Sequence, residues 1–247
     1  MLLEGKRIIL TGGSTGIGRA TAVRAAREGA KIAFFDVNDA DAATALSEIE
    51  ATGAEGCYWH VDIVNSDEVS SAVYEAVEWL GGKVDVLINI AGVLQGANVR
   101  IDEFPEDVWD FVVDINLKGT FLVVKHVSQH MIAAEDGTII ITSSGAGVMG
   151  GSSSYAYGSS KGGTHGFTMV LDSHLGQHGI RVNDVLPGSL NTPLKRAQVE
   201  AVHNAEGKQG SLEEKIDALA SPDGVANVMV WLASDEASFV RGSVRTI

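Results

Sequence analysis

Two residues of the sequence, Tyr157 and Lys161, have the types and the spacing needed for proton transfer. Side chains four residues apart lie on one face of a helix. A phenol with its ordinary pKa of about 10 is a poor base at neutral pH, and a nearby ammonium lowers that pKa by stabilising the phenolate. Such a tyrosine could give and take a proton near neutral pH. The same spacing also occurs where a solvated lysine lies beside a half-buried tyrosine, so the pair acquires meaning only from its context.

A glycine-rich turn, Thr11–Gly18, follows an apolar run and precedes a helical pattern. At the carboxyl edge of a parallel sheet such a turn binds phosphate, because backbone N–H groups and the helix dipole point toward the anion. Gly12 permits the tight turn, Gly16 lets a pyrophosphate approach the backbone, and Gly18 lets the helix pack on the sheet. The spacing is G-x-x-x-G-x-G, and no G-K-[ST] follows, which argues against a nucleoside triphosphatase. Taken alone, the glycines could be ordinary turn chemistry.

Asp36 ends the next apolar run, eighteen residues after Gly18. An acidic residue at about this offset accepts hydrogen bonds from the adenosine ribose, and its charge repels a 2′-phosphate. These features predict NAD rather than NADP as the cofactor. The alternative is that Asp36 only caps the following turn. No arginine or lysine occupies the positions that could hold a 2′-phosphate, which are Ser14, Thr15, Val37 and Asn38.

Short β-branched runs alternate with longer helical patterns along the chain. The alternation predicts a parallel sheet with helices on both faces, and right-handed crossovers make it a doubly wound α/β fold. Asn65 or Ser66 is the predicted N-cap of the third helix, and Gly29 and Gly53 are predicted C-terminal glycines. The seven predicted strands are Arg7–Thr11, Lys31–Asp36, Gly56–Val61, Val84–Ile90, Gly137–Thr142, Ile180–Leu186 and Ser243–Thr246. The predicted helices are Ile17–Glu28, Ala40–Ala51, Ser66–Leu80, Val108–Ala134, Tyr155–Gln177 and Gly224–Ala233.

The length of 247 residues suits one large α/β domain, and no repeat or linker divides the chain. We therefore expect a single dinucleotide-binding and catalytic domain over residues 1–247. The polar, loosely patterned stretch 190–221 is predicted to be an irregular, mobile lid over a site.

The charge balance and the single cysteine limit the partners and the compartment. The 18 basic and 32 acidic residues give a net charge of −14, which disfavours binding to nucleic acid or to an anionic membrane. Cys57 is the only cysteine, so no intrachain disulfide is possible and a reducing compartment is expected. The N-terminus is too charged for a signal peptide, and no apolar stretch approaches the roughly 18 residues of a membrane span. We expect a cytoplasmic protein.

Further motifs occur in a characteristic order along the chain. They are Thr11-Gly12, Gly16-Ile17-Gly18, Asp36, Asp62-Ile63, Asn89-Ile90-Ala91-Gly92, Asn116, Ser144, Tyr157 with Lys161, and Pro187-Gly188 with Thr192. Their order and spacing resemble the short-chain dehydrogenase/reductase family in its single-domain form, and the resemblance covers nearly the whole chain. It implies a Rossmann fold. Ile90 departs from the family pattern, in which a second asparagine is usual there, and Asp184 is an acid inside an apolar strand, facing either a cavity or a subunit contact.

The resemblance implies a role for each catalytic residue. Tyr157 would be the general acid/base, and Lys161 would hold the nicotinamide ribose and lower the pKa of the tyrosine. Ser144 would hydrogen-bond the reacting oxygen of the substrate. Asn116 would help to hold a water that links Lys161 to solvent. The residues implied to bind the cofactor are Gly12, Ser14, Thr15, Gly16, Ile17, Gly18, Asp36, Val37, Asp62, Ile63, Asn89, Ala91, Gly92, Tyr157, Lys161, Pro187, Gly188, Leu190 and Thr192.

Together these residues predict an NAD-dependent oxidoreductase that interconverts a secondary alcohol (polyol, sugar-like or cyclic) and its ketone by hydride transfer. The alternative is a non-catalytic NAD-binding sensor or scaffold. The family usually forms tetramers through its two long helices, here Val108–Ala134 and Tyr155–Gln177, so a homotetramer is expected. No metal site is expected: His126 and His130 have a zinc-binding spacing on a predicted helix, but no third ligand is evident.

Overall fold

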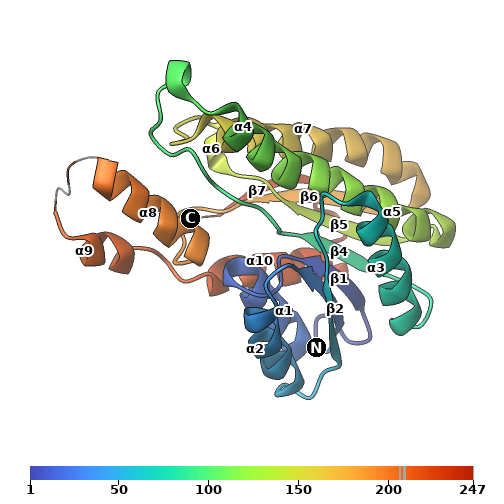
Figure 1. Cartoon of the computed structure of the whole chain (residues 1–247). Coiled ribbons are helices and arrows are strands. Elements are labelled where there is room, and N and C mark those ends of the chain that lie inside the picture. Colours follow the sequence, from blue (N-terminus) through green and yellow to red (C-terminus); the bar gives the residue numbers. More distant parts are fainter. Residues whose placement is uncertain (206, 208–209, 247) are drawn as a thin grey trace.

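A computed structural model describes residues 1–205, 207 and 210–246 of the chain. Within them, seven strands form one parallel sheet in the order β3-β2-β1-β4-β5-β6-β7 (Figure 1). The order reverses direction at β1, whose neighbours are β2 and β4. The strands are β1 (Arg7–Thr11), β2 (Lys31–Asp36), β3 (Gly56–His60), β4 (Val86–Asn89), β5 (Gly137–Thr142), β6 (Ile180–Leu186) and β7 (Gly242–Arg245).

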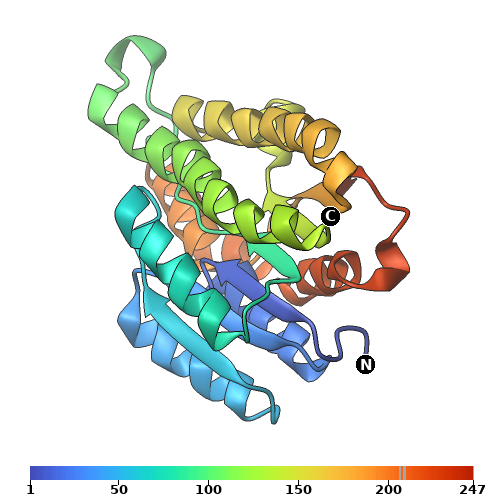
Figure 2. The ribbon, with the colours of Figure 1, turned by 90° about the vertical axis from the view of Figure 1, so that its right-hand side faces the viewer.

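Helices cover both faces of the sheet (Figures 1 and 2). One core cluster joins the sheet to α1 (Gly16–Arg27), α2 (Asp39–Glu50) and α10 (Asp223–Ala233). A second cluster joins it to α3 (Ser66–Trp79) and α5 (Thr120–Ala134). The central strands are short and β-branched because both of their faces are buried; every residue of β5 is buried. The predicted doubly wound fold of seven strands is confirmed.

Most predicted elements lie where the sequence placed them. The strands β1, β2, β5 and β6 have the predicted bounds, and β3, β4 and β7 differ only at their ends. Asn65 caps α3, where its side chain accepts hydrogen bonds from the N–H groups of Asp67 and Glu68. Gly29 and Gly53 both have positive φ angles, +90° and +88°, as expected of glycines that end helices.

The predicted helix Val108–Ala134 is wrong in one respect, because it is interrupted. It divides into α4 (Glu106–Val113), a π-helical turn (Asp114–Gly119) and α5. In the π turn the hydroxyl of Thr120 donates to the carbonyl of Asn116 at 2.7 Å, and the Asn116 side chain bonds to the backbone of Val93. A hydrophobic periodicity cannot reveal a turn that such long-range polar contacts hold open, and π turns are frequent at functional sites.

The stretch 190–221 was predicted to be irregular, and this is also wrong. It contains α8 (Pro193–Ala205) and α9 (Leu212–Asp217), which project from the body of the molecule (Figure 1). His203 is the buried residue of α8, and the other side chains of this helix are at least partly exposed. Backbone pairing between Leu190 and Ala220 closes the base of the segment. Residues 206, 208 and 209 of the predicted lid lie outside the described residues.

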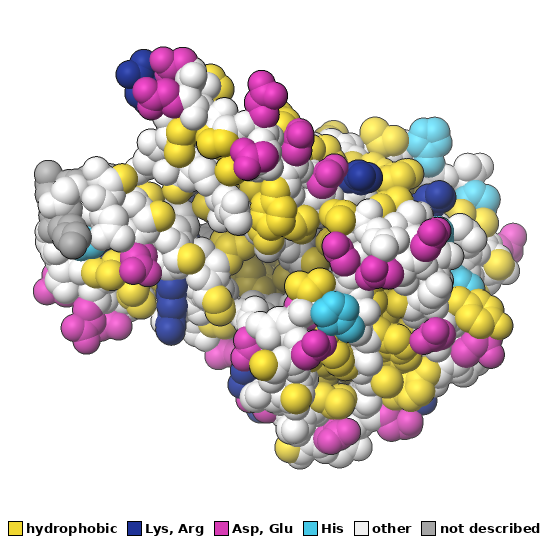
Figure 3. All heavy atoms as spheres, in the orientation of Figure 1, with side chains coloured by type: hydrophobic (Ala, Val, Ile, Leu, Met, Phe, Trp, Pro, Cys, Tyr) yellow, Lys and Arg dark blue, Asp and Glu magenta, His cyan; other side chains and the backbone are white. Residues whose placement is uncertain are grey.

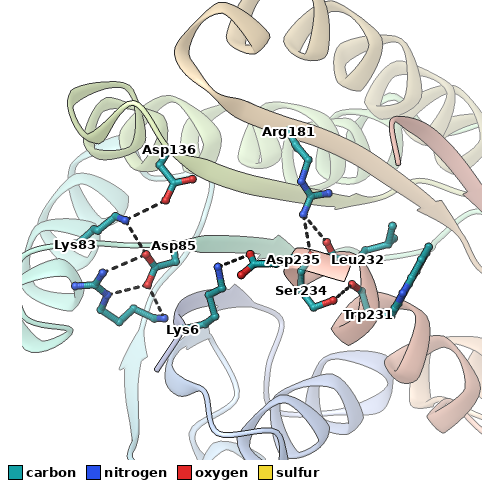
Figure 4. Close-up of polar contacts among 10 residues, drawn as sticks. Lys6, Lys83, Asp85, Asp136, Arg181, Trp231, Leu232, Ser234 and Asp235 are labelled. Carbon is teal, nitrogen blue, oxygen red and sulfur yellow. Dashed lines mark hydrogen bonds and ion pairs between the residues drawn. The ribbon is translucent and has the colours of Figure 1, made fainter. Parts of the chain in front are cut away.

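A polar network holds the amino edge of the sheet, away from the carboxyl ends of the strands (Figure 4). Asp85, only 8% exposed, accepts hydrogen bonds from Arg7 through Nε (2.8 Å), NH2 (3.1 Å) and the backbone N–H (2.9 Å). Lys83 lies 3.1 Å from the same carboxylate. Burial by itself would raise the pKa of Asp85, but hydrogen bonds from Arg7 and Lys83 outweigh it and hold the pKa below its ordinary value of 3.8.

We predict that Asp85→Asn lowers the free energy of unfolding by about 1–3 kcal/mol at pH 7, because Arg7 and Lys83 lose a charged acceptor. The folded-state pKa is depressed, so the stabilisation is present above the ordinary pKa and is lost as pH falls through the folded value. Urea unfolding should therefore show the difference between wild type and variant narrowing below about pH 4. Asp235→Asn is the matched control at the same edge: its side chain is 88% exposed beside Lys6, and the change should be within experimental error.

Candidate active site

The carboxyl ends of the strands surround a crevice with a cavity of about 710 Å³. In Figure 3 the molecule is hollowed beside the α8–α9 segment, with hydrophobic side chains on the floor of the hollow. Segments far apart in the sequence contribute to its wall, from Gly12 after β1 to Leu194 on α8. The cavity brings together the great majority of the predicted site residues. They are Gly12, Thr15, Gly16, Ile17, Gly18, Asp36, Val37, Asp62, Ile63, Ala91, Gly92, Ser144, Tyr157, Lys161, Pro187, Gly188, Leu190 and Thr192.

The glycine turn is packed too tightly for side chains at three of its positions: a Cβ on Gly13 would lie 2.6 Å from the ring of Phe34. A Cβ on Gly12 would lie 2.8 Å from the backbone of Ala91, and Gly12 has a φ of +73°. A Cβ on Gly18 would lie 1.8 Å from the carbonyl oxygen of Gly12. Thr15 is the N-cap residue of α1, but its side chain accepts no hydrogen bond from the first N–H groups of the helix. These N–H groups therefore remain available to a ligand in the crevice. This arrangement is suited to an anion at the helix N-terminus.

The carboxylate of Asp36 is fixed at the edge of the cavity by three backbone N–H groups. Its Oδ2 accepts from Ser14 at 2.9 Å, and its Oδ1 accepts from Val37 at 2.8 Å and Asn38 at 3.1 Å. Asp36 therefore caps the turn after β2, as one interpretation of the sequence predicted, and it also lines the crevice. A carboxylate held in this way presents its remaining lone pairs to the cavity.

The helix α7 (Tyr155–Leu175) carries Tyr157 and Lys161 into the crevice, and Ser154 caps it by accepting from the N–H of Tyr157. Lys161 is only 4% exposed, and its Nζ donates to the carbonyl of Thr142 at 2.6 Å. Burial lowers the pKa of Lys161 to about 8. Burial also raises the pKa of Tyr157, and a hydrogen bond with Ser144 only partly opposes this. The sequence led us to expect a tyrosine pKa lowered by the lysine; the opposite direction here follows from desolvation, with the ammonium bonded to Thr142.

Three predicted site residues, Ser14, Asn89 and Asn116, are buried behind the cavity wall. Asn89 accepts from the hydroxyl of Thr11 and donates to that of Thr120, both at 2.9 Å, so it fixes the strand ends. Ser14 contributes its N–H to Asp36, and its hydroxyl has no partner in the described residues.

Asn116 lies against the catalytic set without lining the cavity. Its Nδ2 donates to the carbonyl of Val93 (2.9 Å) and the hydroxyl of Ser160 (3.0 Å), and its Oδ1 accepts from the N–H of Val93 (2.8 Å). A Cβ on Gly92 would lie 3.0 Å from Asn116 Oδ1 and 3.4 Å from Lys161 Nζ. A side chain at position 92 would therefore be tight, and the side chain of Asn116 or Lys161 would have to move by a few tenths of an ångström to admit it.

Three polar residues of the cavity wall were not singled out from the sequence: Lys195, Gln198 and Arg245. Lys195 and Gln198 are three apart on α8, a spacing that puts them on one face of a helix. That signal was hidden because the stretch was predicted to be irregular. Arg245 ends β7 and is exposed at the wall of the cavity.

The buried acid Asp184 belongs to an internal cluster. It is fully buried in β6, lies 3.0 Å from His165 Nδ1 and accepts a hydrogen bond from the hydroxyl of Ser243. Asp184 thus has side-chain partners within its own chain. Among the described residues no group of three or more His, Cys, Asp or Glu side chains is placed to hold a metal ion, and no helix is long and apolar enough to cross a membrane.

Comparison with known proteins agrees with this geometry. Residues 6–203 match the family model described as short chain dehydrogenase. The chain belongs to the short-chain dehydrogenase/reductase family. It is 38% identical to secoisolariciresinol dehydrogenase of Forsythia intermedia over 97% of this chain and 86% of that protein. It is 37% identical to tropinone reductase-like 2 of Erythroxylum coca over 97% of this chain and 88% of that protein. The crystal structure of an NAD+-bound xylitol dehydrogenase superposes with a TM-score of 0.91 at 31% identity, covering 99% of this chain and 98% of the other.

We predict that Gly18→Ala disrupts the turn, because its Cβ cannot be accommodated 1.8 Å from the Gly12 carbonyl without a backbone shift. Calorimetric titration should show dinucleotide affinity reduced at least about tenfold, equivalent to roughly 1.4 kcal/mol. Gly166→Ala is the control, since Gly166 lies within α7 with open space around it and no positive φ. Alanine is the better helix former there, so that variant should bind normally and unfold at a slightly higher temperature. Normal binding by Gly18→Ala would contradict the assignment of the turn.

Proposed function

We propose that this protein is an NAD-dependent oxidoreductase that interconverts a secondary alcohol and its ketone by hydride transfer. The single observation that carries the proposal is the convergence of Ser144, Tyr157 and Lys161 on the crevice that also holds the glycine turn and Asp36. A proton-transfer group beside a dinucleotide-type cleft is what alcohol oxidation requires.

The residues present fit a dinucleotide along the whole crevice. The glycine turn would hold the diphosphate, Asp36 the adenosine ribose, and Asp62 and Ile63 the adenine. Thr192 would bind the carboxamide, and Lys161 the nicotinamide ribose. When bound, the nicotinamide supplies the hydride acceptor or donor. Tyr157 would be the general acid/base, giving its phenolic proton to the ketone oxygen or, as the phenolate, taking the hydroxyl proton of the alcohol. Ser144 would orient the reacting oxygen.

NAD is preferred in this proposal because Asp36 presents a fixed carboxylate to the ribose site. A 2′-phosphate there would place like charges together in a partly desolvated site. That the similar xylitol dehydrogenase was solved with NAD+ bound supports the same preference.

The wider assembly is part of the proposal. A homotetramer would bury the exposed side chains that lie along α4, α5 and α7, including Trp109, Phe121 and Met169, which are 38, 46 and 61% exposed. Light scattering after size-exclusion chromatography should give a molar mass four times that of the chain. The mass of a single chain would refute the proposed tetramer.

We further propose a cytoplasmic location, one domain over residues 1–247, and the α8–α9 segment as a lid.

We predict that Tyr157→Phe lowers kcat at least about 100-fold on any alcohol the wild type oxidises, because general acid/base catalysis contributes roughly 10²–10⁴-fold. NADH absorbance across a panel of polyols and cyclic alcohols measures this. Tyr155→Phe is the matched control, because Tyr155 lies on the same helix and packs edge-on against Phe104. Unchanged turnover in Tyr157→Phe would remove the tyrosine from the mechanism. NAD binding with no turnover of any alcohol by the wild type would favour a sensor or scaffold.

We predict that Asp36→Ala shifts the ratio of kcat/KM for NAD to that for NADP downward by about 10- to 100-fold. The reason is that a charged hydrogen bond to the ribose is lost, which costs roughly 1.5–3 kcal/mol, and the repulsion of a 2′-phosphate is relieved. Asp39→Ala, which removes an exposed acid from the neighbouring helix start, should leave the ratio unchanged. A wild type that prefers NADP would overturn this cofactor assignment.

A further inference from the structure

The charged groups of the crevice are separated along its length. The carboxylates that line it, Asp36 and Asp62, follow β2 and β3 at the adenosine end. The rest of the described wall contributes the cations Lys161, Lys195 and Arg245 and no carboxylate. Although the net charge of the chain is −14, the charged side chains that line the region where the substrate must bind are all positive. Such a reversal of sign favours an anion there.

Two cations of this region, Arg245 and Lys195, have side chains without a partner among the described residues; Arg245 is exposed, whereas Lys195 is partly buried. The side chain of Lys195 makes neither a hydrogen bond nor an ion pair with any described residue. Its backbone N–H donates to the hydroxyl of Thr192 at 3.3 Å. Lys161, in contrast, is bonded to Thr142. Burial lowers the pKa of Lys195, which shows that its ammonium is partly removed from water. A half-buried charge without a partner is costly, and a bound anion would relieve that cost.

Gln198 identifies the direction in which this face of α8 points. Its Nε2 donates to the hydroxyl of Ser153 at 3.0 Å, in the loop that leads to Tyr157. The Oε1 atom of Gln198 is buried and has no hydrogen-bond partner among the described residues, so it is an unsatisfied acceptor. Lys195 is three residues away on the same face. Arg196 points elsewhere: it donates to Asn191 and lines a separate pocket beside α1.

We propose that the substrate is a hydroxy acid, or the corresponding keto acid, whose carboxylate is bound by Lys195. This rests on the proposed function and names the substrate class for that same site. A lysine ammonium is a compact charge with three N–H donors, and it can bind one carboxylate group of a small substrate. In the oxidative direction the carbinol C–H and O–H bonds would break, the hydride would go to the nicotinamide of NAD+ and the proton to the phenolate oxygen of Tyr157. A C=O bond would form, and the carboxylate would be unchanged.

The strongest competing role for Lys195 is to bind the diphosphate of the cofactor. Thr192, one helical turn before Lys195, lies against the glycine turn, where a Cβ on Gly16 would be 3.1 Å from Thr192 Cβ. The contact of Gln198 with Ser153 argues for the substrate side, because Lys195 shares its face. The experiment below separates the two roles.

The test compares hydroxy acids with their primary amides, which have nearly the same shape and no charge. Both enantiomers of 3-hydroxybutyrate, 4-hydroxypentanoate and 5-hydroxyhexanoate vary the distance from the carbinol to the carboxylate. The wild type should have a kcat/KM at least about tenfold higher for one of these acids than for its amide, the range expected of a charged hydrogen bond. Lys195→Met should reduce that ratio to near one, mainly through KM, while the amide is still oxidised at the wild-type rate. Lys195→Arg should retain most of the preference.

Arg196→Met is the matched control, because it removes one positive charge from the same turn of α8 on its other face; its acid-to-amide ratio should equal that of the wild type. Thermal melting establishes that each variant is folded, and calorimetry gives its NAD dissociation constant. The inference is overturned if Lys195→Met weakens NAD binding and leaves the ratio unchanged, or if the wild type oxidises neutral alcohols and amides but prefers none of the acids. If the wild type binds NAD and oxidises neither class, the proposed function itself fails, and this inference with it.

Discussion

All seven strands run parallel, and the rest of the molecule depends on that constraint. Because parallel strands end at the same edge of a sheet, the segments after β1, β2, β4, β5 and β6 meet there although they are distant in the sequence. The order of the strands reverses at β1, so the crossovers leave β1 and β4 in opposite directions and open a crevice between them. This common edge brings four features into the crevice: the glycine turn, Asp36, Ser144 and Pro187.

Buried polar contacts hold the crevice in shape. Thr11, Asn89 and Thr120 form a chain of hydrogen bonds between β1, β4 and α5. Asn116 continues this bonding to Val93 and Ser160, and thereby ties the π turn to the start of α7. Inside a protein such networks are rigid when every member is satisfied, and they fix side-chain positions more closely than apolar packing does. The helix α7 is therefore positioned by polar contacts at its first turns.

Burial, rather than charge, dominates the proton affinities of the catalytic pair. The pKa of Lys161 is lowered and that of Tyr157 is raised, both by loss of water. In this structure the hydrogen bond of the Lys161 ammonium goes to Thr142. The spacing of Tyr157 and Lys161 determines that they share a face, and the surroundings decide the direction of each pKa.

The sequence by itself determined the class of fold, most strand bounds and most of the residues that line the crevice. These depend on local patterns: β-branched runs that must be buried on both faces, and glycines where a backbone approaches closely. Only the tertiary structure decided the π turn, the helices α8 and α9, and the places of Lys195 and Gln198. Those features depend on contacts between distant segments, such as Asn116 with Val93 and Gln198 with Ser153. A hydrophobic periodicity reports how a segment packs against a core, so a turn held by buried polar bonds between distant segments leaves no such signal.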